Sequence, residues 1–189
     1  MLHSDNNWQI LSSAVHYDNP WIRVTEYKVL NPSQKHGIYG KVHFKNVAVG
    51  IIPLDDMGNI YLVGQFRFTL DKYSIEIPEG GSLINLSTLD SAKRELKEET
   101  GLQANVWKHV LTMHLSNSVT DELALVYLAT ELSFGDPKPD ETEKIDLIKL
   151  PLEKAYQMVL NHEITDSMSV AGILHAKILS LQKLQNEEK

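Results

Sequence analysis

The segment Leu89–Gly101 restricts the fold of this chain more than any other part of the sequence. On a helix with about 100° between successive residues, three glutamates of the segment lie within an arc of about 100°: Glu95, Glu98 and Glu99. The residues that lie beside this arc are apolar and form the predicted buried face: Leu89, Ala92 and Leu96. The segment therefore predicts an amphipathic helix that buries one face in a core and presents three carboxylates side by side.

The three carboxylates lack enough positive charge on their own side of the helix. Lys93 and Lys97 lie on the other side, so Arg94 alone can offset part of the repulsion, which is roughly a few tenths of a kcal/mol per pair. A hard divalent cation that prefers oxygen ligands would convert this repulsion into coordination. Glutamate-rich helix faces are also common as solvated surfaces, and the helix alone leaves both interpretations open.

The segment Ile75–Ser82, which precedes the helix, favours the metal site. A strand-like run ends at Pro78, and Gly80 and Gly81 follow shortly before the helix. Glycine lets the backbone approach a ligand or a cation closely. A glycine-rich turn that faces a carboxylate stripe suits a phosphate together with a metal ion, and a merely solvated helix face has no need of it.

At these residues the chain resembles the Nudix hydrolases. Their signature runs Gly, five residues, Glu, seven residues, Arg-Glu, an aliphatic residue, any residue, Glu-Glu, any residue, Gly and an aliphatic residue. Gly80 occupies the first position here, and the run Arg94–Leu102 closes the signature at the right spacing. The position of the first glutamate holds Leu86 instead. Because that glutamate mainly braces the loop against the helix start in the family, the departure concerns loop rigidity more than metal binding.

The resemblance implies roles for the acidic residues. Glu95 and Glu99 would hold Mg²⁺ or Mn²⁺, with Glu98 as a further ligand and the main-chain carbonyl of Glu79 beside them. Arg94 would steady the acids through its neighbour Glu98. Metal ions that bridge a pyrophosphate neutralise its oxygens, polarise the attacked phosphorus and lower the pKa of a bound water.

Four further segments resemble one subfamily, the pyrophosphatases of ADP-ribose and nucleoside diphosphate sugars: Val63–Arg67, Ser74–Gly80, Ser116–Glu122 and Asp140–Glu143. Glu122 lies in a segment similar to the loop that carries the subfamily's catalytic glutamate, so it is the candidate base; a solvated loop acid is the alternative. The predicted substrate contacts are Arg67, Glu76, Gly80 and Gly81. For Arg67 and Glu76, a cross-strand pair on the surface is an equal alternative.

The predicted activity is metal-dependent hydrolysis of the pyrophosphate bond of ADP-ribose or a related nucleoside diphosphate sugar, which gives a nucleoside monophosphate and a sugar phosphate. Two alternatives remain. The same fold could serve a nucleoside triphosphate pyrophosphohydrolase or an isomerase, or it could be a regulatory Nudix domain that binds a ligand without catalysis. Regulatory versions usually lose acids of the signature, and this chain keeps Glu95, Glu98 and Glu99.

Composition excludes some classes of partner. A net charge of −7 over 189 residues argues against nucleic acid, whose phosphates are bound by basic surfaces. The chain has no cysteine, so it has no disulfide framework. The start Met1–Asn7 has neither the basic nor the apolar region of a signal peptide, and no stretch reaches the length of a membrane span. We therefore expect a cytoplasmic protein without a membrane partner.

The hydrophobic pattern predicts strands first and helices late. Trp21–Leu30 and Ile38–Phe44 predict an N-terminal β-hairpin, and Val47–Leu54 is an apolar run typical of a central strand. Further predicted strands are Ile60–Phe66, Leu102–His114, Leu123–Leu132 and Lys144–Leu150. Predicted helices follow Pro151 and span Val170–Leu181. This order, together with the resemblance, predicts an α+β fold, an α/β/α sandwich with a mixed sheet that follows a small N-terminal antiparallel β element.

We place the N-terminal β element at residues 1–44 and the Nudix hydrolase domain at residues 45–189. Trp21–Leu30 carries apolar side chains on both faces, more than a free surface hairpin would carry. The resembling pyrophosphatases pair through such an element, and a two-fold dimer is the commonest soluble assembly. The sequence therefore predicts a homodimer.

Overall fold

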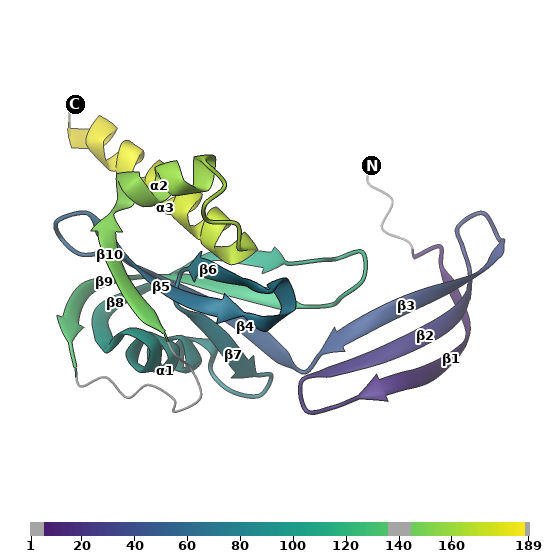
Figure 1. Ribbon diagram of the computed structural model, residues 1–189. Helices are drawn as coiled ribbons and strands as arrows, with labels where there is room; N and C mark the ends of the chain where they lie inside the picture. Colours follow the sequence, from purple (N-terminus) through teal and green to yellow (C-terminus); the bar gives the residue numbers. More distant parts are fainter. Residues whose placement is uncertain (1–5, 136–144, 188–189) are drawn as a thin grey trace. The chain divides into compact units, whose positions relative to one another are not determined.

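The computed structural model describes residues 6–135 and 145–187. The chain forms two compact units (Figure 1). One holds the described residues up to Asn46 together with His114–Leu123, and the other holds Val47–Met113 together with the described residues from Ala124 onward. The predicted boundary after residue 44 stays a prediction about domain organisation. The acidic stretch Asp140–Glu143 and the predicted strand start at Lys144 lie outside the described residues.

The first unit contains an antiparallel sheet in the order β1-β2-β3. Its strands are β1 (Gln9–Asp18), β2 (Ile22–Leu30) and β3 (His36–Phe44). The predicted hairpin is therefore β2 and β3, with Tyr27 opposite Tyr39, but a third strand was missed. All ten residues of β1 are exposed, so β1 lacks the alternation of buried and exposed residues that identifies a strand in a sequence. Its pairing with β2 comes from the backbone.

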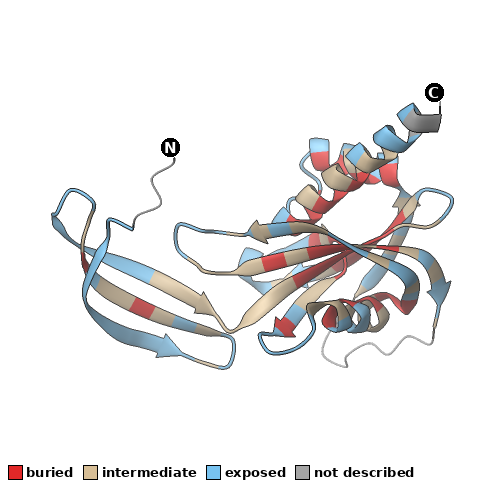
Figure 2. Ribbon diagram, turned by 180° about the vertical axis from the view of Figure 1, so that it is seen from behind, coloured by how far each residue is buried: buried red, intermediate tan, exposed pale blue. Residues whose placement is uncertain are grey.

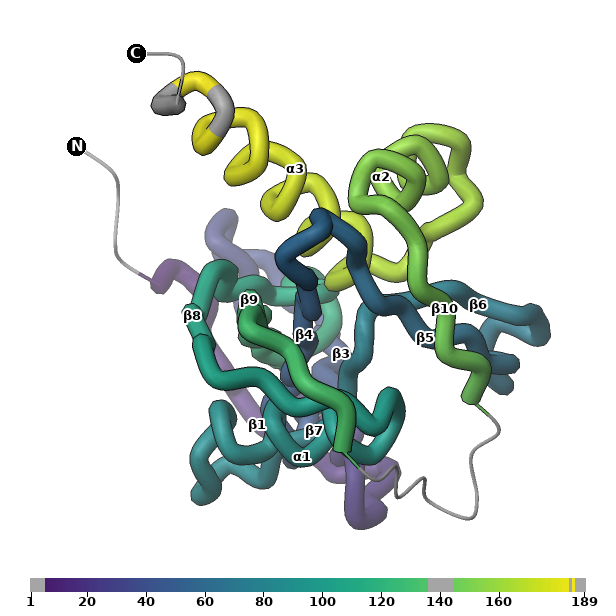
Figure 3. The backbone as a smooth tube through the Cα atoms, turned by 90° about the vertical axis from the view of Figure 1, so that its left-hand side faces the viewer, coloured from purple at the N-terminus to yellow at the C-terminus, as the bar shows by residue number. Residues whose placement is uncertain are grey.

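The second unit is built on two sheets, one mixed and one antiparallel (Figure 3). The mixed sheet has the order β7-β4-β9-β8, and its two central strands run parallel, with Gly50 opposite Val126. Its strands are β4 (Asn46–Pro53), β7 (Glu79–Leu83), β8 (Leu102–His114) and β9 (Leu123–Phe134). The antiparallel sheet has the order β10-β5-β6, formed by β5 (Asn59–Arg67), β6 (Lys72–Glu76) and β10 (Asp146–Pro151). A short 3-10 turn, η1 (Phe68–Leu70), joins β5 to β6.

Helices cover both faces of this arrangement, which confirms the predicted α/β/α sandwich. Figure 1 shows α1 on one side of the strands and the other two helices on the opposite side. The helices are α1 (Thr88–Thr100), α2 (Leu152–Leu160) and α3 (Ser167–Glu187). Among the described residues, no helix combines the length and the apolar character that crossing a membrane requires.

Strand β4 lies in the core of the second unit, and its last five residues, 49–53, are all buried (Figure 2). Val49 and Ile51 are fully buried in a cluster that includes Ala92 and Leu96 of α1. On the other face, a Cβ added to Gly172 of α3 would lie 3.2 Å from Cγ1 of Ile52. Burial on both faces explains why the sequence shows an uninterrupted apolar run here.

The predicted helix of the signature begins and ends as its sequence indicates. The side chain of Ser87 accepts a hydrogen bond from the main-chain N–H of Asp90 at 3.2 Å and caps the first turn. Gly101 follows the last turn with φ 71°, a left-handed conformation that glycine adopts without steric cost. The helix therefore holds its acidic residues in a defined rotational position.

Candidate active site

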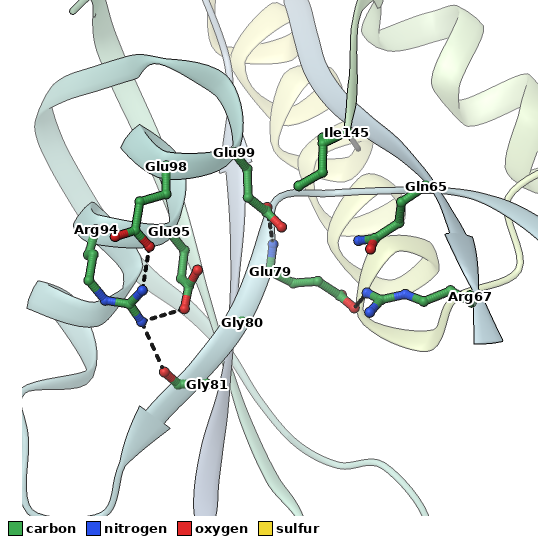
Figure 4. A pocket seen from close by; sticks show the side chains of 10 residues that line it. All are labelled: Gln65, Arg67, Glu79, Gly80, Gly81, Arg94, Glu95, Glu98, Glu99 and Ile145. Carbon is green, nitrogen blue, oxygen red and sulfur yellow. Dashed lines mark hydrogen bonds and ion pairs between the residues drawn. The ribbon is translucent and has the colours of Figure 1, made fainter. Parts of the chain in front are cut away.

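A cleft of about 290 Å³ lies in the second unit, between the first residues of β7, the acidic face of α1 and the end of β5 (Figure 4). Its lining is polar, and most of its side chains are charged. The residues that line it are Gln65, Arg67, Glu79, Gly80, Gly81, Arg94, Glu95, Glu98, Glu99 and Ile145. The structure thus brings together every predicted metal ligand and every predicted substrate contact except Glu76.

Arg94 organises the acidic face of α1. Its guanidinium donates to Oε1 of Glu95 at 2.5 Å and also forms an ion pair with Glu98 one turn further along. It reaches the main-chain carbonyl of Gly81 on β7 at 3.3 Å. The predicted contact between Arg94 and Glu98 is therefore present, and Arg94 also ties the helix to β7. Its role in catalysis stays a prediction.

Gly80 and Gly81 lie in a strand and not in the glycine-rich turn that the sequence suggested. Strand β7 continues directly after Pro78, and among the described glycines only Gly58 and Gly101 have positive φ angles. The glycine at position 80 is needed for space. A Cβ there would lie 2.2 Å from the carboxylate carbon of Glu95, so the strand can meet the carboxylate only without a side chain.

Glu99 forms a second contact between α1 and β7. Its Oε2 accepts a hydrogen bond from the main-chain N–H of Glu79 at 3.0 Å. Glu95 and Glu99 thus contact adjacent residues of β7, on either side of the carbonyl of Glu79 that the resemblance implicates in metal binding. These contacts between α1 and β7 hold the carboxylates of Glu95 and Glu99 next to the main chain of β7.

The side chains of the cleft fit a hard divalent cation in their chemistry. Glu95, Glu98 and Glu99 supply carboxylate oxygens, the donors that Mg²⁺ prefers. In the described part of the chain, no group of three or more His, Asp or Glu side chains lies at metal-ligand spacing. Glu95 and Glu98 pair with Arg94, and the Glu98 side chain is 37% exposed. A cation at this site would compete with Arg94 for their carboxylates.

The opposite end of the cleft holds a second ion-pair network. Arg67 donates from Nε to both carboxylate oxygens of Glu76, each at 3.0 Å, and from Nη2 to Oε2 of the same residue at 2.5 Å. The same Nη2 donates to Oε1 of Glu79 at 2.7 Å. Glu76 is 2% exposed and does not line the cleft. A ligand therefore meets Arg67 and Glu79 before it can meet Glu76.

Glu79 carries an unsatisfied carboxylate oxygen. Its side chain is 11% exposed, and its Oε2 is buried without a hydrogen-bond partner among residues 6–135 and 145–187. Burial is the main cause that raises the pKa of Glu79 well above its usual value, and Arg67 offsets only part of this effect. Three neighbouring carboxylates raise it further: Asp166, Glu76 and Glu99. Because buried polar atoms in folded proteins are nearly always hydrogen-bonded, a bound ligand or water is a natural partner for this oxygen.

The sequence did not predict the buried environment of the Glu79 side chain. Only the main-chain carbonyl of this residue was predicted to take part in the site. The network depends on partners distant in sequence. In the pairing of β5 with β6, Glu76 lies opposite Val63 and Arg67 lies opposite Lys72, and the guanidinium reaches back to Glu76. The residue before α3 is Asp166, which accepts from the N–H and hydroxyl of Ser169 at 2.8 and 2.9 Å. The only local signal was an acidic residue between Pro78 and Gly80.

Glu122, the predicted base, lies in the first unit. It follows a segment that is hydrogen-bonded to β3, because the N–H of Val42 donates to the carbonyl of Val119 at 2.9 Å. The N–H of Asp121 donates in turn to the carbonyl of Val42 at 3.2 Å. The main-chain N–H of Glu122 contacts the hydroxyl of Thr120 at 3.4 Å. Its role as the base stays a prediction.

Asp121, the neighbour of Glu122, anchors this segment. Its carboxylate accepts from the main-chain N–H of Phe44 at 3.0 Å and pairs with Lys41 and His43, each at 2.7 Å. Partial burial would raise the pKa of Asp121, but hydrogen bonds from Lys41 and His43 outweigh it and lower the pKa to about 2. The carboxylate is therefore charged at neutral pH and holds the segment against β3.

Leu86 lies in the connection between β7 and α1 and is 58% exposed. Its N–H donates to the carbonyl of Leu83 at 2.9 Å, which closes a tight turn. The leucine is not a core residue. The turn is held by the backbone where the family's glutamate would brace it.

Two family models match the chain. One, described as NUDIX domain, matches residues 44–168. The other, described as Nucleoside diphosphate sugar hydrolase N-terminal domain, matches residues 8–42. The two matches together cover both the β element and the cleft.

Two curated relatives and one solved structure are similar to the chain. An ADP-ribose pyrophosphatase of Mycobacterium tuberculosis is 37% identical over 67% of this chain, which spans 63% of that relative's length. An ADP-ribose pyrophosphatase of Bacillus subtilis is 32% identical over 69% of the chain and 72% of the relative. The solved structure, a crystal structure of ADP compounds hydrolase, has a TM-score of 0.85 and 18% identity, and covers 96% of this chain and 98% of its own. Its likeness concerns the fold.

Proposed function

Because this chain belongs to the Nudix family, we propose that it hydrolyses the pyrophosphate bond of ADP-ribose or a related nucleoside diphosphate sugar. The products would be a nucleoside monophosphate and a sugar phosphate. The observation that carries this proposal is the cleft in which three carboxylates of α1 lie beside Gly80 and Gly81 of β7. The activity of the two curated relatives supports the same substrate class.

The proposed cofactor is Mg²⁺ or Mn²⁺, held by Glu95, Glu98, Glu99 and the main-chain carbonyl of Glu79. When bound, such a cation supplies positive charge to the pyrophosphate oxygens and acidifies a water. The chain itself contributes the positions of these ligands. Arg94 sets the rotamers of Glu95 and Glu98, and the N–H of Glu79 orients Glu99.

We assign the proton transfer of the hydrolysis to Glu122, which would accept a proton from the attacking water. The support is indirect. Glu122 follows Asp121, whose three contacts hold the segment in one conformation.

A substrate panel tests the proposed function. The purified chain would be assayed with Mg²⁺ or Mn²⁺ against ADP-ribose, other nucleotide sugars, dinucleotides and nucleoside triphosphates, with release of AMP, GMP or phosphate as the readout. We expect the highest kcat/KM for a nucleoside diphosphate sugar. A preference for a triphosphate would replace the proposal with a triphosphate pyrophosphohydrolase. Binding without turnover of any compound would indicate a regulatory domain.

We also propose that the chain works as a homodimer that uses its first unit. The sheet of this unit carries many exposed apolar side chains, which a monomer in water would not favour. They include Ile10, Val15, Tyr17 and Ile38, all more than half exposed, and Trp21 in the connection between β1 and β2 is also more than half exposed. A three-stranded sheet of this kind is stabilised when a second surface covers it.

Sedimentation at micromolar concentrations tests the dimer. We expect a dimer for the natural sequence and a shift to monomer in Ile38→Glu, because a charge at a residue that is 71% exposed would be buried in the interface. Met57→Glu, at an exposed turn of the second unit, is the matched control and should leave the assembly unchanged. A natural chain that sediments as a fully active monomer would contradict the proposal.

A further inference from the structure

The two ends of the cleft differ in what they can bind. Figure 4 shows the side chain of Glu79 pointing away from Glu95 and Glu99 and toward Arg67. At the first end, carboxylates gather on α1 around Arg94. At the second end, one carboxylate oxygen, Oε2 of Glu79, is buried and has no donor among the residues that the structure describes. A donor on a bound ligand would satisfy this oxygen.

Nearby carboxylates compensate the positive charge of Arg67 at this end of the cleft. Its Nε and Nη2 are hydrogen-bonded to Glu76, and Nη2 is shared with Glu79. One positive charge thus faces two carboxylates, and Asp166 adds a third negative charge that acts on Glu79. The excess of negative charge disfavours a further phosphate group here.

A hydroxyl group suits the unsatisfied oxygen. It carries no charge, and it can donate as well as accept, so it can pair with the carboxyl group of Glu79 in either protonation state. Glu79 lines the cleft, and the torsion at the end of a glutamate side chain has a broad profile. A small rotation of the carboxylate can therefore present Oε2 to a bound ligand.

We propose that Glu79 is a specificity-determining residue, whose carboxylate accepts a hydrogen bond from a sugar hydroxyl of the substrate and repels a third phosphate. Arg67 acts through Glu79 as a positioning residue. The inference rests on the proposed function and deepens it, because it explains why a cleft lined with carboxylates would accept a nucleoside diphosphate sugar and reject a nucleoside triphosphate. A sugar places neutral hydroxyl groups where a triphosphate places charge.

Two substitutions of Glu79 separate the two effects. Glu79→Gln removes the charge and leaves a weaker acceptor, whereas Glu79→Asp keeps the charge and withdraws it by one methylene group. We expect both variants to lower kcat/KM for ADP-ribose by about tenfold or more, mainly through KM, since a hydrogen bond to a charged group is lost. Only Glu79→Gln should raise kcat/KM for ATP, because only that variant loses the negative charge.

The control is Glu153→Gln on α2, the same chemical change at a carboxylate that is 56% exposed and pairs with Lys177. This variant should leave kcat/KM unchanged for both ADP-ribose and ATP. Folding is checked by thermal unfolding, and Mn²⁺ affinity is measured by electron paramagnetic resonance of the free ion. Because the acids of α1 remain, Mn²⁺ affinity should stay within about twofold in both Glu79 variants.

The outcomes distinguish this inference from the proposed function. An ADP-ribose to ATP preference that drops in Glu79→Gln, with unchanged Mn²⁺ affinity, supports it. A folded Glu79→Gln that keeps the preference of the natural chain overturns this inference and leaves the proposed function intact. If the natural chain hydrolyses no nucleoside diphosphate sugar of the panel, the proposed function fails and this inference fails with it. If Glu79→Gln does not fold, the KM of Glu79→Asp for ADP-ribose is the test. A raised KM supports this inference, and an unchanged KM overturns it.

Discussion

Replacement of Arg67 by methionine should destabilise the second unit strongly. Methionine keeps much of the length and apolar stem of arginine and removes every hydrogen bond to Glu76 and Glu79. Glu76 is 3% exposed in its side chain and Glu79 11%, so both carboxylates would lose their cation inside the protein. We expect a loss of stability from uncompensated buried charge.

The magnitude follows from the burial of the carboxylates. Removal of one partner of a buried ion pair costs about 3–5 kcal/mol in other proteins. Because the Arg67 side chain is 34% exposed, the lower end, about 3 kcal/mol, is the better expectation. For a chain of this size that corresponds to a fall in Tm of roughly 6–12 °C. Calorimetry and urea unfolding followed by circular dichroism measure both quantities.

The pH dependence gives a second check. The pKa of Glu79 is raised in the folded state, so the stability linked to this group is present below its unfolded pKa and is lost as the pH rises through its folded pKa. Among the described residues, the positive charge of Arg67 lowers the pKa of Glu79, so the removal of Arg67 raises this pKa further. The difference in unfolding free energy between Arg67→Met and the natural chain should therefore be smaller at pH 5 than at pH 8.

The matched control is Arg23→Met, which removes an arginine that is 47% exposed and pairs with Asp18, whose side chain is 38% exposed. No measurable change is expected, since exposed ion pairs contribute little. If Arg67→Met lost less than about 1 kcal/mol at pH 8, the reasoning from buried charge would be refuted. A large rise in KM without loss of stability would instead make Arg67 a direct substrate contact, as its resemblance implies.

The remaining predictions concern the metal ligands, the base and the loop. Glu99→Gln should weaken Mn²⁺ binding by at least tenfold and remove most activity while the unfolding transition stays normal; unchanged metal dependence would contradict the ligand assignment. Glu122→Gln should lower kcat by about 10²–10⁴-fold at an unaltered metal requirement, and a large shift in that requirement would make Glu122 a ligand instead. Leu86→Glu should fold and change the rate only modestly, because Leu86 is exposed; loss of folding would show that the turn depends on the leucine.

The helix of the signature could be derived from the sequence in detail. The period of its apolar residues, Ser87 at its start and Gly101 at its end are local features, and local features determine where a helix begins, ends and turns its faces. The uninterrupted apolar run of β4 likewise predicted a strand covered on both sides. The acidic face and its place opposite Gly80 followed from the same local pattern together with the family resemblance.

Strand β1 could not be derived in this way, because none of its residues is buried and its pairing is made by main-chain groups that every sequence carries. The predicted turn at Gly80 and Gly81 became a strand for a related reason. Glycine marks both a turn and a close approach, and the contact with Glu95, fifteen positions away, decides between them.

By itself the sequence determined the amphipathic helix, the central strand and the set of acids that could bind a cation, because each depends on residues within a few positions of one another. Only the tertiary structure decided the environment of Glu79. Its partners come from β5, β6 and the start of α3, and burial, which converts an ordinary carboxylate into an unsatisfied one, is a property of the packed chain and not of any segment. The environment of Glu122 was likewise decided only by the tertiary structure. Its neighbour Asp121 binds to β3 through residues nearly eighty positions away in the sequence.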